Sequence, residues 1–202
     1  ELRMEKMDSL LNTRTRLVAI THISNVLGTI NPIDEIVSLA HAKNIPVLVD
    51  GAQSVGHYPV DVKESDIDFL VFSAHKMFGP LGTGVLYCKE QWAAQVEAFN
   101  FGGGSIRNVE FERTEFLDYP IRLEAGTANI PGVIGLGSAI DFIQQMSLKD
   151  VTRNERNLSA TFKEKLKALG GISLLGNPEN FGGIVSFQVD SIHPHDVAGF
   201  LA

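Results

Sequence analysis

The sequence is poor in cysteine, in long apolar runs and in clustered positive charge. Its 202 residues include a single cysteine, Cys88, which excludes an internal disulfide framework and any metal site built from several cysteines. No apolar run approaches the roughly 18 residues needed to span a bilayer, and residues 1–14 lack the apolar core of a signal peptide. We therefore expect a cytoplasmic protein with no membrane association.

Acidic residues outnumber basic ones by 24 to 17, and the formal net charge is −7. Lys and Arg are scattered along the chain, so the basic patch that binds nucleic acid or an anionic membrane is absent from the pattern. Hydrophobic residues at 44% and charged residues at 20% are ordinary for a globular protein. This composition favours a function on a small-molecule substrate, and we expect neither nucleic-acid binding nor a bound metal.

Four short apolar runs predict the strands of a buried sheet. They cover residues 16–20, 46–49, 69–72 and 85–88. A helix is predicted between the first two, with Asn31 as its N-cap and Pro32 at its first helical position. Apolar strands separated by helical or loop crossovers indicate an α/β fold with a mainly parallel sheet, covered by helices on both faces.

The second half of the sequence is more varied. Residues 99–127 predict a loop-rich excursion, followed by a helix at residues 133–143. A long amphipathic helix follows, and a strand is predicted at residues 183–189. The apolar face of the long helix is predicted to hold Val151, Leu158, Phe162, Leu166 and Leu169.

These patterns suggest two domains, of which the second is incomplete. We expect residues 1–145 to form part of a large domain and residues 146–202 to start a small α+β C-terminal domain. A last helix begins at about residue 196 and stops after two turns, too soon to cap its carbonyl groups or bury its face. We therefore expect the sequence to be a fragment.

Polar residues gather where the predicted strands end, which is where open α/β sheets bind their ligands. Asp50 ends one strand, and Ser73, His75 and Lys76 follow the next. Pyridoxal 5′-phosphate (PLP) needs an amine that can form a Schiff base with its aldehyde and a carboxylate that keeps its pyridine nitrogen protonated. Lys76 and Asp50 match those needs, Gln53 is in reach of the phenolic oxygen, and Ser73 and His75 suit the phosphate.

Each of these residues taken alone has a simpler interpretation. An aspartate at a strand end is common, a lone lysine is most often solvated, and a lone histidine is most often structural. The glycines of residues 79–84 do not match the phosphate-loop pattern G-x-x-x-x-G-K-[ST], so they predict a tight turn. The combined pattern VDGAQS followed by DFLVFSAHKMFGPLGTGVLY is far more specific than any of its members.

Further segments extend this pattern along nearly the whole chain: THISNVLGTINP, VLVDGAQSVGHYPVDV, FGGGS, RLEAGTANIPGVIGLGSAIDFI and HPHDVAGFL. In their order and spacing the sequence resembles class V aminotransferase-fold PLP enzymes, specifically the Suf-type (group II) cysteine desulfurases and selenocysteine lyases. The resemblance implies the PLP-dependent transferase fold type I. It also implies a PLP cofactor and an amino-acid substrate.

The resemblance assigns roles to the residues at the strand ends. Lys76 would hold the cofactor covalently and shuttle the α-proton of the substrate, with His75 beside it as the second catalytic candidate. Asp50 would pair with the pyridinium nitrogen and Gln53 with the phenolic oxygen. Ser73 and His75 would bind the phosphate.

Two more residues receive roles in the same way. Asn25 is similar to an asparagine near the cofactor and the substrate carboxylate, and Thr127 to a threonine that reaches the phosphate of the neighbouring subunit. The latter implies a homodimer with shared sites. His22 matches no assigned role, and a structural one is at least as well supported.

In family terms, L-cysteine is converted to L-alanine and its sulfur passes to an enzyme cysteine as a persulfide, for transfer to an acceptor protein in iron–sulfur cluster assembly. L-Selenocysteine would react analogously. Cys88 lies in a predicted strand, so we expect a buried, inert thiol. The family's nucleophilic cysteine, and its arginine for the substrate carboxylate, belong to segments outside this sequence.

Other interpretations stay open at this point. They are a selenocysteine lyase, an aminotransferase or epimerase of the same fold, and a non-catalytic, truncated PLP-binding piece. The shared Asp–Lys arrangement does not by itself determine the outcome of the reaction.

Overall fold

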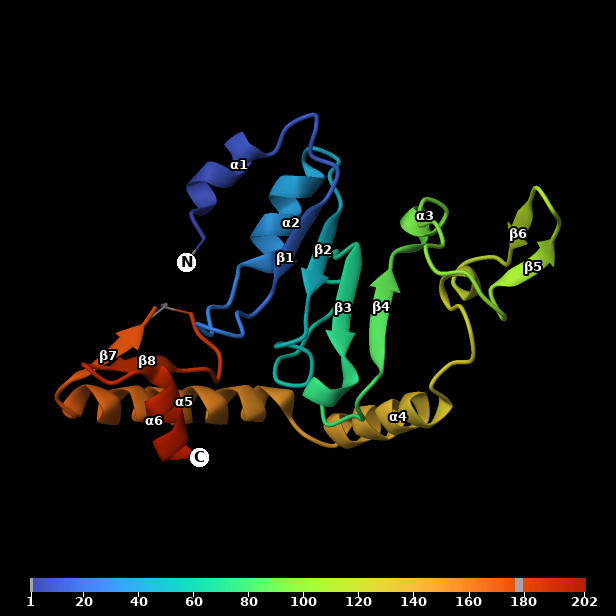
Figure 1. The fold of residues 1–202 in the computed structure, drawn as a ribbon. Coiled ribbons are helices and arrows are strands. Elements are labelled where there is room, and N and C mark those ends of the chain that lie inside the picture. The colour runs from blue at the N-terminus through green and yellow to red at the C-terminus, as the bar shows by residue number, and fades with distance from the viewer. Residues whose placement is uncertain (1, 177–179) are drawn as a thin grey trace.

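The computed structural model describes residues 2–176 and 180–202 (Figure 1). Its strands are β1 (Val18–Thr21), β2 (Val47–Asp50), β3 (Phe69–Ser73), β4 (Gly84–Cys88), β5 (Ile106–Val109), β6 (Thr114–Phe116), β7 (Ile172–Leu175) and β8 (Ser186–Val189). Its α-helices are α1 (Met7–Leu10), α2 (Ile33–His41), α3 (Glu90–Ala93), α4 (Ile130–Gln144), α5 (Leu148–Ala168) and α6 (Pro194–Leu201). Short 3₁₀ helices are η1 (Met4–Lys6), η2 (Ala74–Lys76) and η3 (Ile121–Leu123).

The central sheet has the strand order β1-β2-β3-β4. β1, β2 and β3 run parallel, and β4 returns antiparallel beside β3 (Figure 1). This confirms the predicted α/β fold with a mainly parallel sheet. Because β4 runs the other way, its first residue lies beside the last residue of β3. We call this side of the sheet, where β1–β3 end and β4 begins, the carboxyl edge, and the other side the opposite edge.

Helix α2 covers one face of this sheet. Its buried residues Ile33, Ile36, Val37 and Ala40 form a core cluster with buried residues of β2 and β3. The helix begins one residue later than predicted, with Pro32 as its N-cap. The predicted cap was wrong because the Asn31 side chain has a tertiary partner: its Nδ2 donates to the Thr21 carbonyl oxygen at 2.7 Å.

Helix α4 lies below the carboxyl edge in Figure 1 and contributes to a second core cluster. Its buried residues Leu136 and Ile143 pack with Ala74 of η2 and with Met77. Other apolar residues of α4 are exposed, among them Ile130, Val133, Ile134 and Phe142. Helix α4 therefore packs against η2 with one side and exposes apolar residues on the other.

The remaining part of the chain departs most from the sequence-based expectations. Residues 99–127 contain the hairpin β5–β6, which projects from the molecule, and β7 pairs antiparallel with β8 beside α5 (Figure 1). The predicted apolar face of α5 is only partly confirmed. Leu166 is buried as predicted, but Leu158, Phe162 and Leu169 are exposed, and Ser159 and Lys163 are buried instead.

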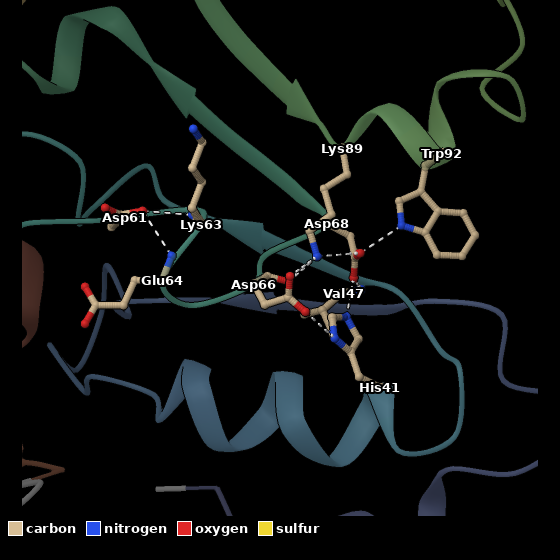
Figure 2. A network of polar contacts seen from close by, with 9 residues as sticks. All are labelled: His41, Val47, Asp61, Lys63, Glu64, Asp66, Asp68, Lys89 and Trp92. Atoms are coloured by element: carbon tan, nitrogen blue, oxygen red, sulfur yellow. Dashed lines mark hydrogen bonds and ion pairs between the residues drawn. The ribbon is translucent and has the colours of Figure 1, made fainter.

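A network of buried charges holds the opposite edge of the sheet together (Figure 2). The Asp68 side chain is fully buried just before β3. Its Oδ2 contacts His41 Nε2 at 2.6 Å and accepts from the Val47 backbone nitrogen at 2.8 Å. Its Oδ1 accepts from Trp92 Nε1 at 2.8 Å and pairs with Lys89 Nζ at 3.2 Å. Asp68 thus joins α2, β2, β3 and the segment after β4.

Asp66 extends this network toward solvent. Its Oδ1 accepts from Lys89 Nζ at 2.6 Å, and its Oδ2 pairs with His41 Nδ1 at 3.0 Å. The hydrogen bond from Lys89 is the main reason that the pKa of Asp66 lies below its usual range. The two carboxylates thus share Lys89 and His41 as polar partners within the network.

Candidate active site

Asp50 occupies the centre of the carboxyl edge. It is the last residue of β2 and lies opposite Thr21 of β1 on one side and Val71 of β3 on the other. Its side chain is exposed, and Oδ1 accepts from the Ala52 backbone nitrogen at 2.9 Å. The carboxylate is therefore oriented by the following turn while it stays accessible to a ligand.

Ser73, His75 and Lys76 follow on the neighbouring strand. Ser73 ends β3 opposite Gly84, and η2 then turns the chain so that Lys76 lies half-buried at its end. The buried Ala74 anchors this turn, because its backbone nitrogen donates to the Thr83 carbonyl oxygen at 2.9 Å. The chain thus leaves β3 in one fixed direction and places Lys76 at the same edge as Asp50.

Gln53 belongs to a loop that packs against this turn. The loop starts at Gly51, whose nitrogen donates to the Val71 carbonyl oxygen at 2.8 Å. At Gly56, with φ of +100°, an added Cβ would lie 2.8 Å from Met77 Cβ and 3.7 Å from the Lys76 carbonyl oxygen. Only glycine allows so close an approach in this conformation. The Gln53 loop and the Lys76 turn are therefore in contact.

Asn25 and Thr127 are held by other parts of the chain. Asn25 is exposed in a turn after β1, and Ser186 Oγ donates to the carbonyl oxygen of the neighbouring Val26. Thr127 is exposed two residues before Asn129, whose Nδ2 donates to Thr83 Oγ1 at 3.3 Å. No interaction among the described residues joins either of them to the other site residues, so their predicted roles stay predictions.

The polar side chains at this edge share one property. Across residues 2–176 and 180–202, no side-chain hydrogen bond or ion pair to another residue involves Asn25, Gln53, Ser73, His75, Lys76 or Thr127. Asp50 has only its bond from the Ala52 nitrogen. These groups are thus available to a ligand, in contrast to the paired charges around Asp68.

His22 lies behind the candidate site. Its backbone nitrogen donates to the Asp50 carbonyl oxygen at 2.9 Å, and its Nδ1 is buried without a partner in the described part of the chain. Burial lowers the pKa of His22, although the charge of Asp34 opposes that shift. The imidazole is therefore neutral at pH 7, which agrees with a structural role.

No sequence pattern indicated the pair that His57 and Glu155 form beside the Gln53 loop. His57 Nδ1 lies 2.7 Å from Glu155 Oε1 of α5, and both side chains line a cavity of about 210 Å³ together with Gln53. Tyr58 also lines this cavity, and its hydroxyl is buried without a hydrogen-bond partner in the described ranges. The sequence separation of 98 between His57 and Glu155 explains why no local pattern predicts the contact.

Comparison with known proteins connects this arrangement to a family. All 202 residues match the family model for aminotransferase class-V. The chain belongs to the class-V aminotransferase family.

The chain is similar to a cysteine desulfurase of Escherichia coli (strain K12 / DH10B), with 43% identity over 99% of the chain. Among solved structures, the cysteine desulfurase of Thermococcus onnurineus NA1 in its apo form has a TM-score of 0.93 at 38% identity over 100% of the chain. A C-DES mutant with glycine covalently linked to its PLP cofactor has a TM-score of 0.84 at 26% identity over 98% of the chain.

The class-V chain spans about half of each of these proteins, namely 49% of the E. coli protein, 50% of the T. onnurineus chain and 53% of C-DES. Within the described ranges it contains no group of three or more His, Cys, Asp or Glu side chains placed to hold a metal ion. The same residues include no helix long and apolar enough to cross a membrane.

Cys88 lies far from the candidate site. It is the last residue of β4 and pairs with Phe69 at the start of β3, whereas Gly84 pairs with Ser73. The two positions are four residue steps apart along the strand, which corresponds to about 13 Å. The thiol is buried, and burial raises its pKa, although a hydrogen bond with Tyr119 opposes the shift. The prediction of a buried thiol in a strand is confirmed.

Proposed function

We propose that this chain forms the cofactor-binding part of a PLP-dependent cysteine desulfurase. The observation that carries the proposal is a set of polar side chains at one sheet edge that have no side-chain partner among the described residues, with Asp50 at the end of β2 and Lys76 just after the neighbouring β3. The set suits PLP: an amine for the aldehyde, a carboxylate for the ring nitrogen, an amide for the phenolic oxygen, and a hydroxyl and an imidazole for the phosphate. The 43% identity to a cysteine desulfurase supports the choice of reaction.

PLP, when bound, supplies an electron-accepting ring that stabilises negative charge at the α-carbon of an amino acid. The carboxylate of Asp50 would hold a proton on the ring nitrogen, which keeps the ring electron-poor. Nζ of Lys76 would bind the cofactor and then move the proton at the α-carbon of L-cysteine. Gln53 would orient the ring by donating to the phenolic oxygen, and Ser73 and His75 would hold the phosphate.

The sulfur of L-cysteine must leave to a thiolate held within bonding distance. Cys88 does not meet this requirement, since its thiol is buried and lies at the opposite edge of the sheet. We therefore propose that the nucleophilic cysteine lies outside these 202 residues, in the part of the protein that corresponds to the unmatched half of the E. coli relative. The persulfide formed there would pass its sulfur to an acceptor.

We also propose that the protein is a homodimer. Exposed apolar residues of α4, among them Ile130, Val133 and Ile134, would be covered by a second copy of the protein. Thr127 lies three residues before this helix, so a partner that covers α4 would come close to it. This agrees with the predicted role of Thr127 at a site shared between subunits.

The decisive test replaces Lys76 in the full-length protein. We expect Lys76→Ala to abolish the visible absorption of lysine-bound cofactor and the formation of alanine from L-cysteine. Lys63→Ala is the matched control, because Lys63 is exposed and precedes β3 at the opposite edge. In the unchanged protein, borohydride reduction followed by peptide mass mapping should find the cofactor on Lys76.

Two outcomes would overturn the proposal. One is a visible chromophore that persists in Lys76→Ala and is trapped by borohydride on a different lysine. The other is a product pattern of pyruvate and ammonia in place of alanine, since those products indicate β-elimination and a C–S lyase rather than a desulfurase.

A further inference from the structure

The Gln53 loop is fastened at both ends. At its start, Gly51 is bonded to β3, and internal turns follow in which the nitrogens of Ser54 and Val55 both donate to the Gly51 carbonyl oxygen at 2.9 Å. Further along, the nitrogens of His57 and Tyr58 donate to the Ser54 carbonyl oxygen at 2.9 and 2.8 Å. The backbone around Gln53 is therefore a continuous series of hydrogen-bonded turns that includes both residue 53 and residue 57.

Helix α5 fixes the far end of this loop by two contacts at the same residue. Glu155 Oε1 lies 2.7 Å from His57 Nδ1, and Thr152 Oγ1 donates to the His57 carbonyl oxygen at 2.7 Å. The Glu155 side chain is 25% exposed, and the His57 side chain is 34% exposed. A half-buried, charge-assisted hydrogen bond of this length holds the imidazole in one orientation.

Gln53, His57 and Glu155 all line the cavity of about 210 Å³ between the loop and α5. The Gln53 amide has no side-chain partner among the described residues that would fix its orientation independently. Its position therefore depends on the turns that His57 and Glu155 hold in place.

We propose that Glu155 is a positioning residue, which acts through His57 to hold the amide of Gln53 against the phenolic oxygen of the cofactor. The inference rests on the proposed function and deepens it by adding a residue of α5 to the control of the cofactor. Glu155 does not touch the cofactor itself. Its effect passes through the loop, so it requires Gln53 to be present.

The test is a double-mutant cycle in the full-length protein loaded with PLP. The readout is the pH midpoint at which the visible band of lysine-bound cofactor titrates. A donor to the phenolic oxygen stabilises its negative charge, so loss of that hydrogen bond raises the midpoint for the proton shared by this oxygen and the lysine nitrogen. We expect Glu155→Ala to raise the midpoint by about 0.4 to 1 unit, which corresponds to one ordinary hydrogen bond.

The background variant Gln53→Ala decides whether the effect passes through Gln53. We expect Gln53→Ala to raise the midpoint and Glu155→Ala to add nothing to it, because coupled residues give non-additive changes. Glu164→Gln is the matched control on the exposed side of α5 and should leave the midpoint unchanged. If Glu155→Ala does not fold, Glu155→Gln takes its place in the cycle, with a smaller shift of the same sign.

Three results would overturn the inference: no shift in the Glu155 variants, an equal shift in the Gln53→Ala background, or an equal shift in Glu164→Gln. The absence of any visible band in the unchanged protein would instead overturn the proposed function. The two failures are thus distinguishable.

Discussion

The two edges of the central sheet use charged residues in opposite ways. At the opposite edge, the buried Asp68 carboxylate has contacts from His41, Val47, Trp92 and Lys89 (Figure 2). At the carboxyl edge, Asp50 has one backbone donor, and Lys76 pairs with no residue of the described chain. The same sheet therefore carries one aspartate whose hydrogen bonds are satisfied within the protein and one that is left accessible.

The difference separates a charged residue that stabilises the fold from a charged residue that is available to bind a ligand. A buried carboxylate is stable only when donors replace the water that it has lost, and Asp68 meets that condition. An exposed carboxylate at the end of a central strand is free to pair with a ligand. We therefore expect the same substitution at the two edges to affect different properties.

The largest expected effect is that of Asp68→Asn. The amide carries no charge to pair with Lys89, and its NH₂ group cannot accept the hydrogen bonds that the carboxylate accepts. Removing one partner of a buried charge network typically costs about 3–5 kcal/mol in the free energy of unfolding. Urea unfolding of the full-length protein measures this loss, while the visible band of the bound cofactor should keep its position.

The matched substitution at the other edge is Asp50→Asn. Its side chain is exposed, so the free energy of unfolding should stay within about 0.5 kcal/mol of the original value. Alanine formation should instead fall on the order of 10²-fold or more, because a preorganised charge contact is lost. Equal losses of stability in Asp50→Asn and Asp68→Asn would show that the two edges do not differ in this way.

We expect a smaller effect on the free energy of unfolding when the pH is lowered. Burial raises the pKa of Asp68, but the hydrogen bonds from His41, Trp92, Val47 and Lys89 together outweigh burial and hold that pKa below the ordinary value of 3.8. A carboxylate with a lowered folded-state pKa stabilises the protein above its unfolded-state pKa, and this stability is lost as pH falls through the folded-state pKa.

At pH values below about 4, we therefore expect the free energy of unfolding to decrease, in part because Asp68 and Asp66 become protonated. Unfolding measured between pH 6 and pH 3 should show a shallower decline in Asp68→Asn, which has no carboxylate to protonate at that position. An unchanged slope in this variant would mean that the network does not contribute to acid sensitivity.

The sequence predicted those parts of the fold that depend on local pattern. Continuous apolar runs identified all four strands of the central sheet to within a few residues, and the strands that end at Asp50 and Ser73 are adjacent in that sheet. The hairpin β5–β6 was missed because its residues are mainly polar and exposed, without the alternation that marks a half-buried strand.

Tertiary contacts account for the remaining differences. In α5 the predicted apolar stripe is partly exposed, and Lys163 is buried instead because its Nζ lies 3.3 Å from the centre of the Phe181 ring. The network around Asp68 joins segments that are separate in sequence, as does the pair of His57 with Glu155. Such contacts leave no periodic signal in the chain.

The smallest expected effect is that of Cys88→Ser, which tests whether the opposite edge takes any part in the reaction. The thiol is buried, donates to the Lys89 carbonyl oxygen at 3.3 Å and lies about 13 Å along the strand from the position beside Ser73. Burial raises its pKa, so it stays protonated at neutral pH, whereas attack on sulfur requires a thiolate. A serine hydroxyl can donate to the same carbonyl oxygen.

We therefore expect Cys88→Ser to retain the full rate of alanine formation and to lose about 1 kcal/mol of stability or less. Mass spectrometry of the unchanged protein after incubation with L-cysteine should find no added sulfur on the peptide that contains Cys88. If the variant stopped producing alanine while its unfolding free energy stayed the same, the nucleophile would be Cys88. In that case the separation between a reactive carboxyl edge and a structural opposite edge would no longer hold, because the reacting thiol would lie on the side of the sheet that Asp68 holds together.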